Sequence, residues 1–219
     1  MNKVIVTGAN RGLGLELCRQ LQDRGDHVTA VCRKTSGELE QMDVSVFDGI
    51  DVSNQNSINT LRDELQGTRF DWLVNNAGIL SREGLADLDF EAIERQFRVN
   101  SIGPLMVTQA LLGSLQAGSK VGIVTSRMGS IDDNTSGGYY GYRMSKAAVN
   151  IAGKSLSHDL REQGIAVGLL HPGMVATDMT GRNGVPVSHA ASGLIARMDE
   201  LNLESSGSFW HAEGQLLPW

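Results

Sequence analysis

The stretch Val4-Ile5-Val6-Thr7-Gly8-Ala9-Asn10-Arg11-Gly12-Leu13-Gly14, close to the N-terminus, determines the fold that we expect. A short apolar strand precedes the glycines and a helical pattern follows them, so the glycines form the turn between the two. Glycine allows a tight turn and a close approach of the backbone to a phosphate, and the helix N-terminus offers that phosphate free N–H groups and a positive dipole end. We therefore predict a dinucleotide site here; the alternative is a turn whose glycines only pack. The predicted cofactor contacts are Gly8, Asn10, Arg11, Gly12, Leu13 and Gly14.

The rest of the chain alternates between strand-like and helix-like segments. Apolar runs rich in β-branched residues predict strands over residues 4–7, 27–32, 45–50, 72–75, 121–126 and 165–171, with a weaker one over 208–210. Apolar residues at helical spacing predict helices over residues 13–23, 57–66, 90–115, 142–163 and 188–200. This order predicts the α/β class: a single doubly wound, Rossmann-type domain over residues 1–219, with a parallel sheet of about seven strands and helices on both faces.

Composition narrows the class of protein. The chain has 219 residues, of which 41% are hydrophobic, and a formal net charge of -6, so we expect one core and no basic surface for nucleic acid. No signal peptide and no apolar run of membrane-spanning length are present in the sequence, which favours a cytoplasmic protein without a membrane partner. Cys18 and Cys32 are too far apart for a Cys-x-x-Cys motif, and we interpret them as small buried hydrophobic residues. No metal site is predicted.

A tyrosine followed by a lysine four residues later is the candidate reactive pair. Tyr142 and Lys146 share one face of a predicted helix, and Ser126 ends an upstream strand. A phenol has a pKa of about 10, so it is a poor acid near neutral pH unless a nearby cation favours its ionised form. A hydroxyl from a separate strand could hold the substrate oxygen that the phenol protonates, which predicts proton delivery to a carbonyl. The rival Tyr139 is followed at the same spacing by Arg143, and arginine hardly exchanges a proton.

Taken together, several motifs resemble those of the short-chain dehydrogenase/reductases. They are the glycine turn, Asn75-Asn76-Ala77-Gly78, Ser126, Tyr142-x-x-x-Lys146 and His171-Pro172-Gly173, and they follow one another at the ends of successive predicted strands. The likeness covers nearly the whole chain. Within that family, the segments 128–131 and 133–142 and the ending Leu217-Pro218-Trp219 look like the C-factor and sniffer-like carbonyl reductase branch.

The resemblance implies four catalytic residues: Asn100, Ser126, Tyr142 and Lys146. By this likeness, Lys146 bonds the nicotinamide ribose and, with the oxidised nicotinamide ring, lowers the pKa of Tyr142. Tyr142 protonates the substrate oxygen as hydride arrives, and Ser126 holds that oxygen in place. Asn100 bends its helix locally and positions a water in a proton relay through Lys146.

The choice of nucleotide depends on the end of the second predicted strand. An NAD-preferring Rossmann protein places a carboxylate there for the ribose 2′-hydroxyl, but this chain has Arg33-Lys34. A guanidinium can bind a 2′-phosphate in a bidentate manner, and Arg11 lies where similar NADP-using members carry a second basic residue. These residues predict NADP(H) rather than NAD(H), unless Arg33 and Lys34 are only solvated loop cations.

The resemblance assigns the remaining cofactor contacts to three segments. Asp51 and Val52 match the position beside the adenine ring, and Asn76, Ala77 and Gly78 match the passage close to the adenosine ribose. The segment along the nicotinamide contributes Pro172, Gly173, Val175 and Thr177. Tyr142 and Lys146 also belong to this set. In the family, the position of His171 is replaceable strand-end material, so we do not assign it as a base.

These inferences predict an NADPH-dependent oxidoreductase that reduces an aldehyde or ketone to an alcohol. The alternative is an NADP(H)-binding regulatory or signalling protein with little or no turnover. The chain lacks the lid helices that family members insert after Thr177, so we expect an open pocket for small or varied carbonyl compounds. Its expected walls are Leu80, Arg127, Met128, Met174 and Met179, although the methionines could equally be ordinary packing.

Two apolar helices predict self-association. The helix over residues 101–115 and the helix that begins with Tyr142 are apolar on more than one side. In the family these helices commonly pair with their symmetry mates, which implies a homodimer or homotetramer. Burial of the same residues inside the monomer is the alternative.

Overall fold

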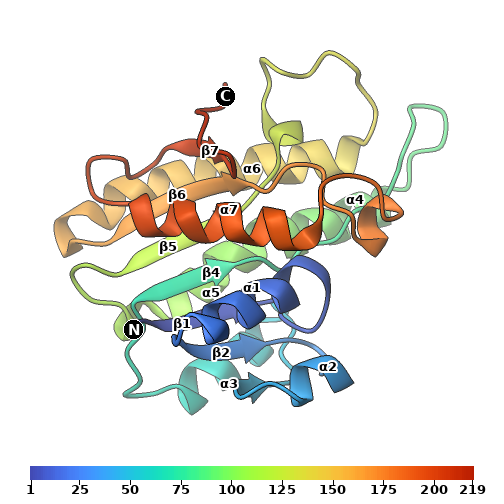
Figure 1. Cartoon of the computed structure of the whole chain (residues 1–219). Helices are drawn as coiled ribbons and strands as arrows, with labels where there is room; N and C mark the ends of the chain where they lie inside the picture. Colours follow the sequence, from blue (N-terminus) through green and yellow to red (C-terminus); the bar gives the residue numbers. More distant parts are fainter.

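The computed structural model describes residues 1–219 and contains one parallel sheet of seven strands (Figure 1). The strands are β1 (Lys3–Thr7), β2 (His27–Val31), β3 (Ser45–Phe47), β4 (Trp72–Asn75), β5 (Lys120–Val124), β6 (Ala166–His171) and β7 (Phe209–His211). Their order is β3-β2-β1-β4-β5-β6-β7, and every neighbouring pair is parallel. The direction of the strand order reverses between β1 and β4, so the carboxyl ends of these strands flank the crevice where such sheets bind ligands.

Helices cover both faces of the sheet, as the alternating sequence pattern predicts. They are α1 (Gly12–Asp23), α2 (Gly37–Glu40), α3 (Gln55–Glu64), α4 (Phe90–Phe97), α5 (Gly103–Ala110), α6 (Tyr140–Asp159) and α7 (Val187–Glu200). Figure 1 shows α1 and α7 on the near face of the sheet, with α5 and α6 behind it. The predicted doubly wound α/β fold is therefore confirmed.

Each face of the sheet has its own hydrophobic core. Val4 and Val6 of β1 pack with Leu17 of α1, in a cluster that also contains residues of α7. Ile5, between them, points to the opposite face and joins residues of α3, α5 and α6. Consecutive strand residues face opposite sides, so a strand buried on both faces must be apolar throughout. This is why the strands appear in the sequence as continuous apolar runs.

The single helix predicted over residues 90–115 is wrong in detail, because the chain forms several consecutive pieces there. A π-helical segment, Arg98–Ile102, separates α4 from α5, and a short 3-10 turn, Leu112–Ser114, follows α5. Pro104 has no N–H to donate to the carbonyl of Asn100, four residues earlier, so the regular α-helical bond cannot form at that point. The expected local distortion at Asn100 is thus present in the backbone.

Other boundaries also differ from the prediction. Ser126 lies two residues beyond β5, and α6 begins at Tyr140, which places Tyr142 in the first turn of the helix. The sequence pattern missed α2, a helix of 4 residues that is capped by a hydrogen bond from Leu39 N to Ser36 Oγ at 3.3 Å. So short a helix has too few residues to show a periodic pattern.

Both cysteines are free and buried, as predicted. Burial raises the pKa of the Cys18 thiol to about 12, with a further contribution from Cys32, so the reactive thiolate is suppressed. None of the helices is both long enough and apolar enough to cross a membrane. The structure also contains no group of three or more His, Cys, Asp or Glu side chains arranged to hold a metal ion.

Candidate active site

The glycine turn packs against the segment that follows β4 so closely that side chains do not fit. Gly8 has a φ of 67°, and a Cβ there would lie 2.8 Å from the Cα of Ala77. A Cβ on Gly14 would collide with the carbonyl oxygen of Gly8 and lie 2.6 Å from Asn76 Nδ2. Asn76 fixes the turn by donating from Nδ2 to the Thr7 carbonyl at 2.9 Å and to the Gly8 carbonyl at 3.3 Å. Residues 76–77 therefore support the turn as well as bordering the predicted nucleotide site.

The start of α1 leaves backbone donors available beside this turn. Arg11 occupies the N-cap position without a side-chain cap, and the first helical bond runs from Leu15 N to Arg11 O at 3.3 Å. Gly12, Leu13 and Gly14 therefore have no intrahelical acceptor for their N–H groups. Such donors, at the positive end of a helix dipole, suit the pyrophosphate of a dinucleotide.

Gly14→Ala is expected to destabilise the fold by about 1–3 kcal/mol, because the new Cβ requires the turn to shift. Nucleotide binding should weaken by about tenfold or more, since each 1.4 kcal/mol of misfit is a factor of ten in affinity. Urea denaturation and nucleotide titration by fluorescence measure the two effects. Gly113→Ala is the matched control, because a Cβ there meets nothing within 4 Å. Equal stability and affinity in the Gly14 and Gly113 variants would contradict the close-packing argument.

At the far end of the predicted nucleotide site, the charge of Arg33 acts on the Asp51 carboxyl. Burial alone would raise the pKa of the Asp51 carboxyl, but hydrogen bonds from Ser53 and the charge of Arg33 hold it below its usual value. Asp51 Oδ1 accepts from Ser53 N at 2.9 Å and from Ser53 Oγ at 2.7 Å. The second carboxylate oxygen has no hydrogen bond to protein, which suits the expected contact with the adenine amine. Arg11 and Arg33 are both exposed.

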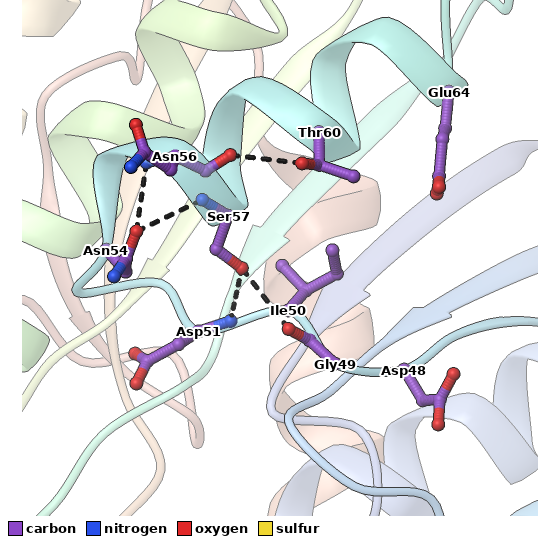
Figure 2. Close-up of a pocket in the computed structure, with 9 residues that line it drawn as sticks. All are labelled: Asp48, Gly49, Ile50, Asp51, Asn54, Asn56, Ser57, Thr60 and Glu64. Carbon is purple, nitrogen blue, oxygen red and sulfur yellow. Dashed lines mark hydrogen bonds between the residues drawn. The ribbon is translucent and has the colours of Figure 1, made fainter.

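The connection between β3 and α3, together with α3, forms a pocket of about 390 Å³ beside Asp51 (Figure 2). Its lining residues are Asp48, Gly49, Ile50, Asp51, Asn54, Asn56, Ser57, Thr60 and Glu64. Ser57 Oγ accepts from Asp51 N at 2.8 Å and donates to the Gly49 carbonyl at 3.3 Å, so the pocket wall fixes the backbone of Asp51. None of the four predicted catalytic residues lines this pocket, so we assign it no chemical role.

Tyr142, Lys146 and Ser126 come together at the carboxyl end of β5. Lys146 Nζ lies 5.7 Å from the centroid of the Tyr142 ring and donates to the Val124 carbonyl at 2.9 Å. The Ser126 hydroxyl interacts with the Tyr142 hydroxyl and also accepts from Met128 N at 3.1 Å. Because the Met128 N–H occupies a lone pair of Ser126, the Ser126 proton remains available to donate. The predicted trio is therefore assembled by α6 and by the turn after β5.

Asn100 connects this group to the chain that follows β4. Its Oδ1 accepts from Ile79 N at 2.8 Å, and its Nδ2 donates to the Ile79 carbonyl at 2.9 Å and to Ser145 Oγ at 3.0 Å. A Cβ on Gly78 would lie 3.4 Å from Asn100 Oδ1 and 3.8 Å from Lys146 Nζ, so the three residues converge. Both the oxygen and the nitrogen of the Asn100 amide are thus bonded to protein.

The electrostatics of the site differ from the expectation for Tyr142. Burial raises the pKa of the phenol to about 12, and the hydrogen bond with Ser126 only partly opposes this shift. Burial also lowers the pKa of the Lys146 ammonium to about 8, and Lys146 forms no salt bridge. At neutral pH the phenol therefore holds its proton beside a buried cation. The lowered phenol pKa that the resemblance implies is not a property of the chain by itself, because desolvation outweighs the hydrogen bond with Ser126.

The segment after β6 borders the glycine turn on its other side. The position that a Cβ on Gly12 would take is 3.4 Å from Thr177 Cγ2. Val175 O accepts from Thr180 Oγ1 at 2.6 Å and from Thr177 N at 2.8 Å, whereas the N–H of Val175 makes no hydrogen bond within the chain. The Thr177 hydroxyl accepts from the backbone of Thr180, so its proton is free. A backbone donor and a hydroxyl donor therefore lie where the resemblance places the carboxamide of the nicotinamide.

His171, at the end of β6, is unsuited to act as a base. It is 9% exposed and meets His211 edge to face, with the ring centroids 5.0 Å apart. Burial lowers its pKa to about 3, assisted by the positive charge that His211, Arg127 and Lys146 can carry. The imidazole is therefore neutral at physiological pH, and its Nδ1 is buried without a partner.

The free energy of unfolding is expected to fall as the pH is lowered below about 6.5, by up to about 1.4 kcal/mol per pH unit for this group. The unfolded chain binds a proton at His171 near pH 6.5, but the folded chain does so only near pH 3. Acid therefore favours the unfolded state across this interval. Urea denaturation between about pH 7 and 4.5 should show a shallower slope for His171→Asn than for wild type. The exposed His27→Asn is the control, and equal slopes in all three proteins would refute the assignment.

Two residues that the sequence did not single out hold the predicted site residues in place. Ser145 is fully buried, accepts from Asn100 and donates from Oγ to the Tyr142 carbonyl at 2.8 Å. Thr7 Oγ1 accepts from Asn76 N at 3.0 Å and from Ala77 N at 3.1 Å. A serine inside a helix and a threonine in a strand are ordinary in sequence, so no local signal marks these long-range contacts. Of the expected substrate walls, Met174 is 62% and Met179 is 40% exposed.

Comparison with known proteins agrees with this geometry. The chain is 43% identical to a 1-hydroxy-2-glutathionyl-2-methyl-3-butene dehydrogenase of Rhodococcus sp. (strain AD45), over 100% of both proteins. It is 46% identical to C-signal of Myxococcus xanthus, over 68% of this chain and 92% of that protein.

The fold of this chain is also similar to that of solved carbonyl reductases. The carbonyl reductase Sniffer of D. melanogaster superposes with a TM-score of 0.91 at 29% identity, covering 100% of both chains. An NADPH-bound carbonyl reductase from chicken fatty liver superposes with a TM-score of 0.90 at 28% identity, covering 99% of this chain and 98% of that one. The likeness to the C-factor and sniffer-like branch is thereby confirmed. The model of the short chain dehydrogenase family matches residues 2–185, and this chain belongs to that family.

Proposed function

We propose that this protein uses NADPH to reduce the carbonyl group of an aldehyde or ketone to an alcohol, and that it acts on the CH–OH group in the reverse direction. The observation that carries the proposal is the position of the Lys146 ammonium, which is buried without a carboxylate partner and lies beside the Tyr142 phenol. The phenol in turn interacts with Ser126. This arrangement lies at the carboxyl edge of the sheet, next to the glycine turn. A protonated phenol beside a buried cation is suited to deliver a proton to a developing alkoxide.

The chain's residues divide the work of protonation. When bound, the reduced nicotinamide supplies the hydride. Ser126 has its proton free and donates a hydrogen bond to the substrate oxygen, which places the carbonyl carbon for attack. Tyr142 then gives its proton to the same oxygen as negative charge develops there. Lys146, with a pKa of about 8, stabilises the resulting phenolate and can return a proton to it.

Asn100 acts through its main chain in this proposal. Its amide is held by Ile79 and Ser145, and Pro104 provides no N–H for its carbonyl. A carbonyl released from the helix in this way can accept a hydrogen bond from a water, and that water can connect Lys146 with solvent. Metal ions have no part in the mechanism that we propose.

The chain's residues fit NADP(H). The free N–H groups at the start of α1 would hold the pyrophosphate, Asp51 and Val52 would contact the adenine, and Arg11 and Arg33 would bind the 2′-phosphate. The solved carbonyl reductase from chicken fatty liver, with 28% identity, is described as NADPH-bound, which supports this assignment. The full set of proposed contacts is Gly8, Asn10, Arg11, Gly12, Leu13, Gly14, Arg33, Asp51, Val52, Asn76, Ala77, Gly78, Tyr142, Lys146, Pro172, Gly173, Val175 and Thr177.

Arg33→Asp is expected to weaken NADPH binding by about 10- to 100-fold, because a charge-assisted hydrogen bond contributes about 1.5–3 kcal/mol. NADH has no 2′-phosphate, so its dissociation constant should change by less than about threefold. Fluorescence titration with both nucleotides measures the difference. Arg62→Asp is the control, because Arg62 is an exposed arginine paired with Asp63 on α3. Equal losses for NADPH and NADH in the Arg33 variant would remove this cofactor assignment.

A regulatory or signalling protein that binds NADP(H) is the second candidate, and the likeness to C-signal favours it. The test is to mix the purified protein with NADPH and a panel of aldehydes, ketones and quinones, and to follow the nicotinamide absorbance. The enzyme proposal expects turnover with members of the panel. Tight NADPH binding without turnover of any compound would favour the signalling role instead.

We also infer that the protein forms a homodimer or homotetramer through α5 and α6. Leu105 is 44%, Met144 53% and Ile151 66% exposed on these helices. Other apolar residues of the same helices, including Val107 and Val149, are buried within the monomer. The apolar residues of these helices therefore serve two purposes: some form the core of the monomer, and only the exposed ones are available for association. Light scattering coupled to size-exclusion chromatography measures the oligomeric state.

A further inference from the structure

The segment between β5 and α6, residues 127–138, which we call the rim loop, borders the catalytic residues at both of its ends. Ser126 precedes it, and Tyr142 follows it in the first turn of α6. Apart from one short 3-10 turn, Arg127–Gly129, the loop has no regular structure. Ile131 is 81% exposed, and no residue of the loop belongs to the hydrophobic clusters. Apolar burial therefore does not hold the rim loop in place, and polar contacts must do so.

The C-terminal segment provides the first of these contacts. The main-chain oxygen of Trp219 accepts from Ile131 N at 2.5 Å, from Ser130 Oγ at 2.9 Å and from Asp132 N at 3.3 Å. The Trp219 ring packs on Phe209 of β7, with the centroids 5.4 Å apart, and Leu217 N donates to the Phe209 carbonyl at 2.8 Å. Figure 1 shows the C-terminus on the same side of the molecule as the loop. The rim loop is thus connected to the edge strand of the sheet.

Arg143, the residue after Tyr142, provides the second contact. Its Nε donates to the Gly138 carbonyl at 3.2 Å and to the Gly137 carbonyl at 3.3 Å, and its Nη2 donates to Ser136 Oγ at 2.9 Å. Its Nη1 reaches the Met128 carbonyl at 3.4 Å, so a single guanidinium connects both ends of the loop. The planar fork of arginine permits these several directions, whereas a lysine ammonium is a point charge.

We propose that Trp219 and Arg143 are positioning residues that hold the rim loop as a preformed wall of the substrate site, and so favour carbonyl compounds large enough to contact that wall. The inference rests on the proposed carbonyl reduction. A loop ordered in advance does not have to be ordered by the substrate, so the substrate keeps more of its binding energy. A small carbonyl compound held only by Ser126 and Tyr142 gains nothing from the wall. The two residues therefore affect substrate choice more than the chemical step.

The test compares a small and a large substrate in Arg143→Lys and Trp219→Ala. In both variants the KM for an aromatic 1,2-diketone should rise by about fivefold or more, while the KM for acetaldehyde changes by less than about twofold. The kcat for both substrates and the dissociation constant of NADPH should stay within about twofold of wild type. Equal losses of kcat/KM for the two substrates would overturn the proposal, because they would indicate general damage to the site.

Arg161→Lys is the matched control. Arg161 also donates to a main-chain carbonyl, that of Leu203 at 2.8 Å, but it lies beyond the opposite end of α6. Amide hydrogen exchange over residues 130–138 gives a readout that needs no turnover: exchange should be faster in Arg143→Lys and Trp219→Ala and unchanged in Arg161→Lys. Unchanged exchange in Arg143→Lys and Trp219→Ala would overturn the proposal that these two residues hold the rim loop, whatever the activity of the variants. If the wild type shows no turnover but exchange is still faster in these two variants, the proposed reaction is refuted and the role of the two residues in holding the rim loop is supported.

Discussion

Tyr142→Phe is expected to lower kcat for carbonyl reduction by about 10²- to 10⁴-fold, the range that a positioned proton donor contributes. The phenol interacts with Ser126, and burial raises its pKa to about 12, so the phenol carries its proton at neutral pH. Phenylalanine fills nearly the same space but has no proton to give. The NADPH dissociation constant should therefore change by less than about threefold, and steady-state kinetics with a titration measures both quantities.

The neighbouring tyrosines are the controls for this substitution. Tyr140 is 36% exposed, and Tyr139 is the N-cap residue of α6. Tyr140→Phe should keep turnover within about threefold of wild type, because its hydroxyl has no part in the proposed mechanism. If Tyr142→Phe turned over as fast as Tyr140→Phe, the proton would have to come from another group and the proposed mechanism would be wrong.

Lys146→Met is expected to lower kcat/KM by about 10²- to 10³-fold, as the loss of a preorganised charge at a reacting centre does. It should also change the pH dependence. Burial lowers the pKa of Lys146 to about 8, so the ammonium is present below that pH and is lost above it. Wild-type reduction should therefore slow as the pH rises through about 8, whereas Lys146→Met should be slow throughout and lack this decline. Rate profiles between about pH 6 and 9.5 measure both effects.

Lys154→Met is the control for the lysine. Lys154 lies two turns further along the same helix and has no contact with Tyr142 or Ser126 in the site. It should keep both the rate and the pH profile of wild type. A Lys146 variant that retained the decline near pH 8 would show that a different group titrates there, which would remove Lys146 from the proton path.

The alternation of strands and helices was sufficient to predict the sheet, because each strand buried on both faces is a continuous apolar run. It failed between residues 90 and 115, where apolar residues continue at helical spacing through a helix that is interrupted. The interruption follows from Pro104 and from the hydrogen bonds of Asn100 with Ile79 and Ser145. Periodicity reports which side of a helix is apolar, and it contains no information about contacts between distant segments.

In the candidate site too, local spacing was predictable from the sequence, whereas contacts between distant segments were not. The spacing of Tyr142 and Lys146 correctly predicted a shared helix face, but it could not give the degree of desolvation that raises the phenol pKa. The rim loop is a stronger case, because the bond from Ser130 to Trp219 joins residues 89 positions apart in the chain. A tryptophan at the end of the sequence has no local pattern that could indicate its contact with the rim loop. The sequence was therefore sufficient to nominate candidate catalytic side chains, but not the residues that hold them in position.

Transfer of deuterium from cofactor to product tests the central claim most directly. Wild-type protein is mixed with NADPH that carries deuterium at both C4 positions of the nicotinamide and with carbonyl compounds from the panel, and each product is analysed by mass spectrometry. The proposed reaction predicts an alcohol that carries cofactor deuterium on the former carbonyl carbon, with its hydroxyl proton taken from solvent by way of Tyr142. Bound NADPH without deuterated alcohol from any member of the panel would contradict it.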